Sequence, residues 1–185
     1  MLYNNKEYDK KYSSIEFSIY YGNIKEYDVS DGPGVRVALY VSGCLHHCRG
    51  CHNRDAWDYK YGSRFTSNEI KMILSRLKFE QISGLSILGG EPLDPKNRND
   101  VFSIVEIVKD MCPDKTIWIW TGYTWEEIMK TNIIPKDILE KIDVIVDGKF
   151  IQSERNITLK YRGSANQRVI DVKETIKNGS ITYYS

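Results

Sequence analysis

Residues 35–53 read VRVALYVSGCLHHCRGCHN and join a strand-like run to a loop rich in cysteine. Residues 35–42 are nearly continuous in apolar character, as expected of a strand that is covered on both faces of a parallel sheet. Cys44, Cys48 and Cys51 follow at once. Because sites in parallel sheets lie at the carboxyl ends of the strands, this stretch predicts a thiol-lined site at the edge of an α/β sheet.

Similar strand-like runs recur further along the chain, at residues 85–88, 116–121 and 142–146. Amphipathic patterns predict helices at residues 68–79 and 100–111, and shorter ones after Thr124 and after Pro135. The spacings of Thr66 with Glu69 and of Thr124 with Glu127 are typical of capping boxes. This alternation predicts an α/β fold with a mostly parallel sheet, and the units are too few for an eight-stranded barrel. We therefore expect an open, partial βα barrel.

The bulk composition limits the function classes. The chain has 185 residues with 26 basic and 25 acidic side chains, so the net charge of +1 argues against nucleic acid or anionic membrane as a partner. The length suits a single domain over residues 1–185. No signal peptide or membrane span is recognisable, and we expect a cytoplasmic protein. Residues 1–20 and 172–185 are assigned no role.

The cysteine spacing C-x3-C-x2-C places three thiolates on one short loop, which suits an iron-sulfur cluster or zinc. A 4Fe-4S cluster with three protein ligands keeps one iron open for a substrate. Two alternatives remain: a zinc site completed by His46, His47 or His52, and a redox disulfide between the second and third cysteines. Cys112 lies far from the triplet and is expected to be a small buried apolar residue.

At this triplet the sequence resembles the radical S-adenosylmethionine superfamily, whose C-x3-C-x2-C motif follows the first barrel strand. DGPGVR at residues 31–36 and CHN at residues 51–53 resemble the glycyl-radical-enzyme activases. LGGEPL at residues 88–93 looks like the segment that binds the methionine amino group in that superfamily. WTGYT, VDGKF and YRGSANQR, at residues 120–124, 146–150 and 161–168, are similar to the activating proteins of anaerobic ribonucleoside-triphosphate reductases.

The resemblance implies a radical S-adenosylmethionine type of partial barrel with a 4Fe-4S cluster on Cys44, Cys48 and Cys51. S-adenosylmethionine would be the second cofactor, bound by Gly89, Gly90 and Glu91. Two glycines after a strand also allow backbone to approach a ligand, and a carboxylate accepts from an ammonium group. The superfamily commonly has an aromatic residue before the third cysteine. Here that position is Gly50, and His52 is expected to substitute in cofactor binding.

The resemblance also implies the reaction and its partners. Reductive cleavage of S-adenosylmethionine would generate a glycyl radical on an anaerobic ribonucleoside-triphosphate reductase, with a flavodoxin- or ferredoxin-type protein as electron donor. The alternative is an activase of another glycyl-radical enzyme, such as pyruvate formate-lyase. No catalytic side chain is expected beyond the three cluster ligands.

Four further side chains and one segment are open to interpretation. Arg36 is expected to pair with a ligand carboxylate or to brace its loop. Trp118, Trp120 and Tyr123 are expected to pack in the core. The segment between Arg162 and Arg168 is expected to face the protein partner.

Overall fold

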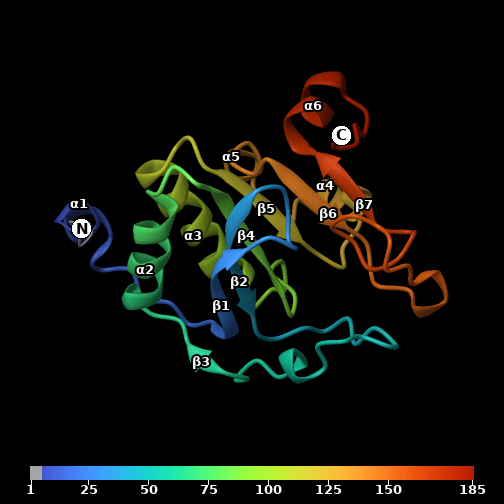
Figure 1. Ribbon diagram of the computed structural model, residues 1–185, viewed down its shortest axis with the longest axis horizontal. Helices are drawn as coiled ribbons and strands as arrows, with labels where there is room; N and C mark the ends of the chain where they lie inside the picture. The colour runs from blue at the N-terminus through green and yellow to red at the C-terminus, as the bar shows by residue number, and fades with distance from the viewer. Residues whose placement is uncertain (1–5) are drawn as a thin grey trace.

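The computed structural model describes residues 6–185, and its strands form a seven-stranded sheet in the order β3-β1-β2-β4-β5-β6-β7 (Figure 1). The strands are β1 (Tyr20–Asp28), β2 (Val35–Val41), β3 (Ser63–Arg64), β4 (Ile82–Gly89), β5 (Thr116–Trp120), β6 (Val144–Asp147) and β7 (Arg168–Asp171). The α-helices are α1 (Lys6–Tyr12), α2 (Ser67–Leu77), α3 (Arg98–Met111), α4 (Trp125–Thr131), α5 (Lys136–Leu139) and α6 (Val172–Asn178). Two 3-10 turns, η1 (Asp55–Trp57) and η2 (Gln152–Glu154), lie in the long loops. Residues 1–5 of the amino-terminal segment lie outside the described residues.

The sheet is parallel at its centre and antiparallel at its edges. Neighbouring strands β2, β4, β5 and β6 run parallel, whereas β1, β3 and β7 pair antiparallel. The strand order ends at β3 on one side and at β7 on the other, so the sheet does not close. These findings confirm the predicted mixed α/β class and the open sheet with a parallel core.

Both predicted capping boxes are present. The Thr66 N–H donates to Glu69 Oε2 at 2.7 Å at the start of α2, and the Thr124 N–H donates to Glu127 Oε2 at 2.8 Å at the start of α4. Each pair satisfies amide groups that the first helical turn leaves without intrahelical partners. The helix predicted after Pro135 is the short α5.

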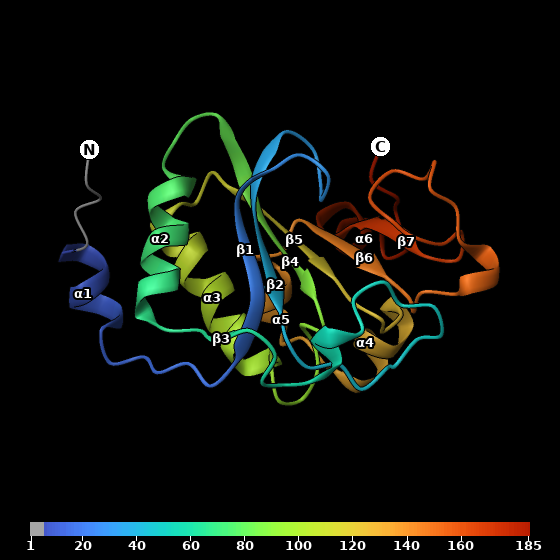
Figure 2. The same cartoon turned by 60° about the horizontal axis from the view of Figure 1, so that its bottom comes forward.

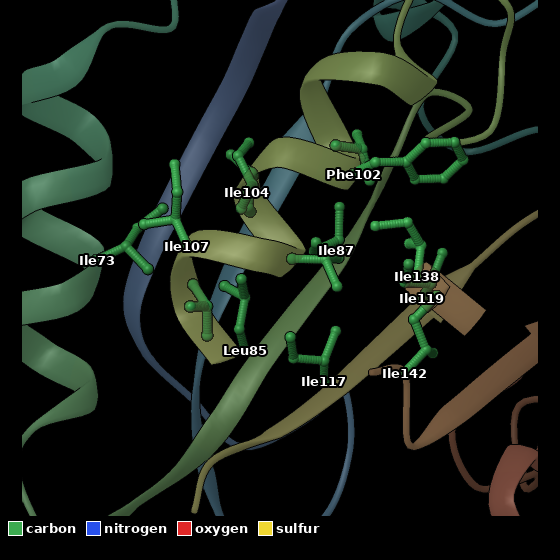
Figure 3. Packing of buried hydrophobic residues seen from close by; sticks show 14 of the residues in the cluster. Ile73, Leu85, Ile87, Phe102, Ile104, Ile107, Ile117, Ile119, Ile138 and Ile142 are labelled. Atoms are coloured by element: carbon green, nitrogen blue, oxygen red, sulfur yellow. The ribbon is translucent and has the colours of Figure 1, made fainter. Parts of the chain in front are cut away.

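The main hydrophobic core lies between the sheet and the helices on one of its faces. Figure 3 shows Ile107 of α3 beside Ile73 of α2, with Leu85 and Ile87 of β4 and Ile117 and Ile119 of β5 on the other side of α3. All six side chains are fully buried. Alternate residues of each strand point to this face, so the intervening residues are left for the other face.

On that other face, the register of the strands aligns residues in rows. Tyr40 pairs with Leu88, and the neighbouring pair Ile87–Ile119 places Trp120 beside Leu88. The next row toward the amino ends holds Ala38, Ser86 and Trp118. Trp118 is buried, as predicted, and forms a second small cluster with Val144 and Val146. The row of Tyr40, Leu88 and Trp120 is nearer the carboxyl ends of the strands, so it would form the floor of a site at that edge.

Arg36 braces the amino-terminal end of this face. Its guanidinium donates from Nε to Ser86 Oγ at 2.7 Å, from Nη1 to Thr116 Oγ1 at 2.9 Å and from Nη2 to the Leu85 and Thr116 carbonyls at 2.9 and 3.1 Å. The side chain is fully buried, and burial lowers the pKa of Arg36 to about 10, so it stays protonated at neutral pH. Of its two expected roles, the contacts show bracing.

Replacing Arg36 with methionine is expected to lower the free energy of unfolding by about 3 kcal/mol, because it leaves buried carbonyl and hydroxyl groups without donors. Urea unfolding of the two proteins measures the difference. Lys136→Met, whose lysine side chain is 86% exposed, is the matched control and should change the unfolding free energy by less than about 0.5 kcal/mol. Equal stability of both variants would contradict the bracing role.

The ends of the described chain pack at opposite sides of the sheet, as Figure 2 shows for α1 and α6. Lys11 and Tyr12 both donate to Asp110 of α3 at 2.9 Å, which ties α1 to the helical layer. After α6 the chain returns to β7, where the Tyr184 N–H donates to the Val169 carbonyl at 2.9 Å. Within residues 6–185, no helix combines the length and apolar character that crossing a membrane would need.

Candidate functional site

A cavity of about 610 Å³ opens at the carboxyl ends of the parallel strands. It brings together all the site residues that the sequence predicts, namely Cys44, Cys48, Gly50, Cys51, His52, Gly89, Gly90 and Glu91. They come from the loop after β2 and from the last residue of β4 and the loop that follows it, at the edge where sites in such sheets lie. Cys112 is buried at the end of α3, away from this cavity.

Backbone hydrogen bonds hold the cysteine loop in place. The Gly43 N–H donates to the Ala56 carbonyl at 2.8 Å, and the Cys44 N–H donates to the Trp57 carbonyl at 3.3 Å. Gly43 has a φ of +94°, and a Cβ on it would lie 2.1 Å from the ring of Tyr59. Only glycine fits this position, which is where the chain leaves β2 and turns into the loop.

The cysteines of the loop are free thiols. Burial raises the pKa of the Cys44 thiol to about 11, and backbone hydrogen bonds from His46 and His47 oppose this rise. Burial also raises the pKa of Cys48, against a backbone hydrogen bond from Phe150. Both thiols are therefore protonated at neutral pH in the absence of metal, and binding to iron must displace their protons.

The side chains of the loop are not arranged around a single ion. Within residues 6–185, no group of three or more histidine, cysteine, aspartate or glutamate side chains has the placement needed to hold one metal ion. The zinc alternative requires such a group around the three cysteines and one of His46, His47 or His52. A 4Fe-4S cluster, by contrast, binds each thiolate through a different iron.

The Gly-Gly-Glu segment is bonded directly to the cysteine loop. The Gly90 N–H donates to the Val41 carbonyl at 2.7 Å, and the Glu91 N–H donates to the Gly43 carbonyl at 2.8 Å. A Cβ on Gly90 would lie 2.5 Å from the Gly43 oxygen. Asn97 Nδ2 joins the two loops further by donating to the carbonyls of Gly43 and Glu91 at 3.2 and 2.9 Å. The two predicted motifs thus form one backbone unit.

The carboxylate of Glu91 is almost fully buried and is held by donors from its own loop and from the loop after β5. Oε1 accepts from the Leu93 N–H at 2.8 Å and from Thr121 Oγ1 at 2.7 Å, while Oε2 accepts from the Gly122 N–H at 2.7 Å. Sequence reasoning identified Glu91 but not these partners. The WTGYT motif after β5 therefore serves to fix this carboxylate.

Gly50 and His52 lie at another part of the cavity wall. Gly50 has a φ of +78°, and a Cβ there would lie 2.8 Å from the side chain of Gln152. A left-handed conformation is strained for an aromatic residue, which gives a physical reason for glycine at this position. The side chain of His52 is exposed at the rim.

Sequence reasoning missed the floor of the cavity, which Tyr40, Leu88 and Trp120 form. Trp120 packs against the small cluster around Trp118, as expected of a core residue, but it also lines the cavity. Its Nε1–H donates to the Tyr161 carbonyl at 2.7 Å, which fixes the ring. The hydroxyl of Tyr40 donates to the carboxylate of Asp31. The strand register, which sequence alone does not give, brings these rings together.

The late motifs mainly brace the loop that follows β6. Arg168 donates from Nε to Asp147 Oδ1 at 3.0 Å and from Nη2 to Glu126 Oε2 at 2.7 Å. Asp147 is fully buried and also accepts from the Trp125 N–H at 2.7 Å. The guanidinium of Arg162 donates to the Gln167 carbonyl. Charge reversal at Arg168 would therefore disrupt the loop itself, and it does not isolate a partner surface as the sequence suggested.

Known proteins similar to this chain agree with these motifs. Residues 30–170 match a family described as a 4Fe-4S single cluster domain. The chain is 46% identical over 142 residues to a protein of Vibrio cholerae, covering 76% of this chain and 90% of the relative. It is 44% identical to a relative from Enterobacteria phage T4, covering 80% and 92%, and 40% identical to one from Escherichia coli K12, covering 77% and 92%. All three relatives are named anaerobic ribonucleoside-triphosphate reductase-activating protein. The chain therefore belongs to the family of 4Fe-4S anaerobic ribonucleoside-triphosphate reductase-activating proteins.

Proposed function

We propose that this protein activates an anaerobic ribonucleoside-triphosphate reductase by reductive cleavage of S-adenosylmethionine at a 4Fe-4S cluster, which generates a glycyl radical on the reductase. The observation that carries the proposal is the gathering of the three loop cysteines and the Gly-Gly-Glu segment around one cavity. The names of the relatives support the reductase as the partner. They give no support to the alternative of an activase for pyruvate formate-lyase.

The loop fits a cluster with three protein ligands, and we assign Cys44, Cys48 and Cys51 to this role. These thiols are free and line the same cavity. Backbone groups of the loop and of Phe150 already hydrogen-bond to the first two sulfur atoms. Hydrogen bonds of this kind stabilise thiolates bound to iron and tune the cluster. Three thiolates leave one iron open for a substrate.

The cavity also suits S-adenosylmethionine. Its volume of about 610 Å³ falls within the range of small-molecule sites. Gly89 and Gly90 let backbone approach the amino-acid end of the ligand, and Glu91 supplies a fixed negative charge for its ammonium group. Gly50 and His52 are proposed to contact the ligand from another part of the cavity wall. No catalytic side chain beyond the cluster ligands is proposed.

We also propose that the open sheet belongs to a partial βα barrel of the radical S-adenosylmethionine type. Residues 1–185 are proposed to form one domain. The open sheet with its parallel centre supports this assignment, as does the position of the cysteine loop after β2. Both loops of the proposed cofactor site follow parallel strands. No role is proposed for residues 172–185, which follow β7.

A reduced cluster held by Cys44, Cys48 and Cys51 would supply one electron for cleavage of the sulfonium C–S bond of S-adenosylmethionine, which would release methionine and allow the 5′-deoxyadenosyl group to take a hydrogen atom from a glycine of the reductase. The chain contributes orientation and shelter. The hydrogen-bonded unit of Gly43, Gly90 and Glu91 fixes the two cofactor loops relative to one another. Leu88 and Trp120 give the floor an apolar surface that keeps water from the reacting group.

A flavodoxin- or ferredoxin-type protein is proposed as the electron donor, and the cytoplasm as the compartment. Cys48 and Cys51 are partly exposed, so a donor could approach the cluster from their side. Four cysteines without a disulfide suit a reducing compartment.

The partner assignment is tested by incubating the iron-reconstituted, dithionite-reduced protein with S-adenosylmethionine and one of two candidate partners. The expected result is that 5′-deoxyadenosine and a radical on the partner form together with an anaerobic ribonucleoside-triphosphate reductase and not with pyruvate formate-lyase. Chromatography measures the first product and electron paramagnetic resonance the second. A radical on pyruvate formate-lyase alone would contradict the assignment, while loss of both products from cluster-loaded protein would contradict the chemistry.

A further inference from the structure

A second cavity, of about 760 Å³, adjoins the first one. Tyr161 and Arg162 line both, so the two cavities meet at this pair of residues. The wall of the second cavity comes mainly from the segment between β6 and β7 and from the last residues of the chain. We call this cavity the basic groove. Its lining includes Lys160, Tyr161, Arg162, Arg168, Tyr183 and Tyr184.

Aromatic contacts hold the basic groove in shape. The buried ring of Trp118 contacts Tyr161 edge to face with centroids 5.2 Å apart, and it contacts Tyr184 in the same manner at 4.9 Å. The carbonyl of Tyr161 also accepts from Trp120 Nε1 in the floor of the first cavity. The groove is therefore preformed on the same face of the sheet, and Tyr161 links it to the first cavity.

The positive charge of the basic groove is only partly neutralised by this chain. Arg168 is already paired with two carboxylates. Lys160, in contrast, is exposed and forms no ion pair within residues 6–185. In the same part of the chain, Arg162 donates to the Gln167 carbonyl and meets no carboxylate. No aspartate or glutamate side chain among the described residues lines the groove. Two cations thus remain available to acidic groups of a partner.

The groove also presents aromatic surface to solvent. Tyr183 is 62% exposed and Tyr184 is 37% exposed. Tyrosine and arginine are enriched in protein interfaces, because each combines a large contact area with hydrogen-bonding groups. Two exposed tyrosines beside two unpaired cations therefore have the composition of a surface that binds a polypeptide.

The proposed reaction requires space of this kind next to the first cavity. A glycine that gives up a hydrogen atom to a group inside the cavity is part of a main chain. The residues on either side of that glycine must therefore lie outside the cavity while the glycine is within it. The basic groove adjoins the cavity and supplies such a space.

We infer that the basic groove binds an acidic segment of the reductase that lies next to its target glycine. Carboxylates of this segment pair with Lys160 and Arg162, and its apolar side chains pack against Tyr183. The inference rests on the proposed function, which makes the reductase the partner. Pairing of opposite charges sets the direction in which the segment lies and raises the rate of encounter.

The test uses the cluster-loaded protein and an intact anaerobic ribonucleoside-triphosphate reductase. Lys160→Glu reverses one unpaired charge, and Tyr183→Ala removes the exposed ring but keeps the backbone bridge to Ile170. Lys160 and Tyr183 line the basic groove, and neither lines the first cavity. Lys10→Glu is the matched control, because Lys10 is an exposed lysine of α1, at the opposite side of the sheet from α6.

The affinity for the reductase is measured anaerobically by biolayer interferometry, and 5′-deoxyadenosine formation is measured without reductase. We expect Lys160→Glu to weaken binding about tenfold at low ionic strength, with a smaller difference as salt is added. Tyr183→Ala should weaken binding about fivefold, and Lys10→Glu should change it less than about twofold. Without reductase, the variants should form 5′-deoxyadenosine as the unmodified protein does, because the first cavity is unchanged.

Photocrosslinking identifies the bound segment. With the photoreactive amino acid p-benzoylphenylalanine at position 183, mass spectrometry should find a crosslink within about ten residues of the target glycine, a span of about 33 Å in an extended chain. The crosslinked segment should contain aspartate or glutamate. A crosslink to a distant part of the reductase, or to a segment without acidic residues, would overturn the inference.

The outcomes separate the inference from the proposed function. Reductase binding by Lys160→Glu and Tyr183→Ala that equals binding by the unmodified protein would overturn the inference, and a radical on the reductase would still support the proposed function. Equal weakening by Lys10→Glu would show a general charge effect and would overturn the inference as well. If the unmodified protein neither bound the reductase nor formed a radical on it, the proposed partner itself would be wrong.

Discussion

Replacement of any one of Cys44, Cys48 and Cys51 by alanine is expected to abolish formation of 5′-deoxyadenosine, with a loss of at least about a thousandfold. Each thiolate is proposed to hold a separate iron, and the described structure offers no fourth cysteine near the cavity to replace a missing one. The variants should also retain less iron and sulfide after anaerobic reconstitution. Colorimetric iron and sulfide determination, followed by chromatography of the products, measures both effects.

Cys112→Ala is the matched control for this series. Cys112 is buried at the end of α3 and does not line the cavity, so its replacement should leave iron content and product formation unchanged. It should cost about 1 kcal/mol of unfolding free energy through lost packing. Full iron content in all three loop variants, or loss of iron in the control, would contradict the assignment of the ligands.

Gly90→Ala is expected to reduce 5′-deoxyadenosine formation by about a hundredfold or more. The added Cβ would lie 2.5 Å from the carbonyl oxygen of Gly43 and 3.0 Å from that of Ala56. Both are backbone atoms, so the clash can be relieved only by moving the cysteine loop away from the Gly-Gly-Glu segment. Misplacing the two cofactor loops by a fraction of an ångström should impair ligand binding and chemistry together.

Gly163→Ala provides a control in the same cavity. There the added Cβ would lie 3.3 Å from the Phe150 ring, a side chain that can shift slightly. We expect less than about a threefold change in product formation from this variant. Similar effects of the two substitutions would show that the backbone contact between Gly43 and Gly90 does not matter for the reaction.

The parallel core of the fold could be predicted from the sequence because each core strand carries a local signal. The run at residues 35–42 matches β2 (Val35–Val41), and the capping spacings match the starts of α2 and α4. β4 begins before its predicted apolar run at residues 85–88, because Ser83 and Gly84 interrupt the apolar pattern that Ile82 starts. A Cβ on Gly84 would lie 2.0 Å from the Thr116 carbonyl, so close strand approach explains the glycine.

The edge strands carry no comparable signal. β1 (Tyr20–Asp28) mixes exposed and partly buried residues along its length, so neither alternation nor an apolar run marks it. β7 (Arg168–Asp171) is short and exists through its antiparallel pairing with β6. These pairings depend on contacts between distant parts of the chain, which local propensity does not encode.

The candidate site likewise has a part that the sequence predicts and a part that it does not. The cysteines and the Gly-Gly-Glu segment are contiguous motifs, so the sequence could mark both as candidate site residues, while their roles in binding a cluster and S-adenosylmethionine were implied by the family resemblance. The floor residues Tyr40 and Trp120 come from strands far apart in sequence, and only the register aligns them. The contact between His46 and Glu91 likewise requires two loops to be packed against each other. No spacing rule within the sequence predicts such a contact.

Electron paramagnetic resonance of the anaerobic reductase tests most directly whether this chain generates a glycyl radical on it. The reductase is incubated anaerobically with S-adenosylmethionine and reduced, cluster-loaded activating protein, either unmodified or carrying Cys44→Ala. We expect a glycyl radical signal with the unmodified protein, altered when the reductase contains deuterated glycine, and no signal with the variant. A radical of equal intensity with the variant, or none with the fully loaded unmodified protein, would contradict that expectation.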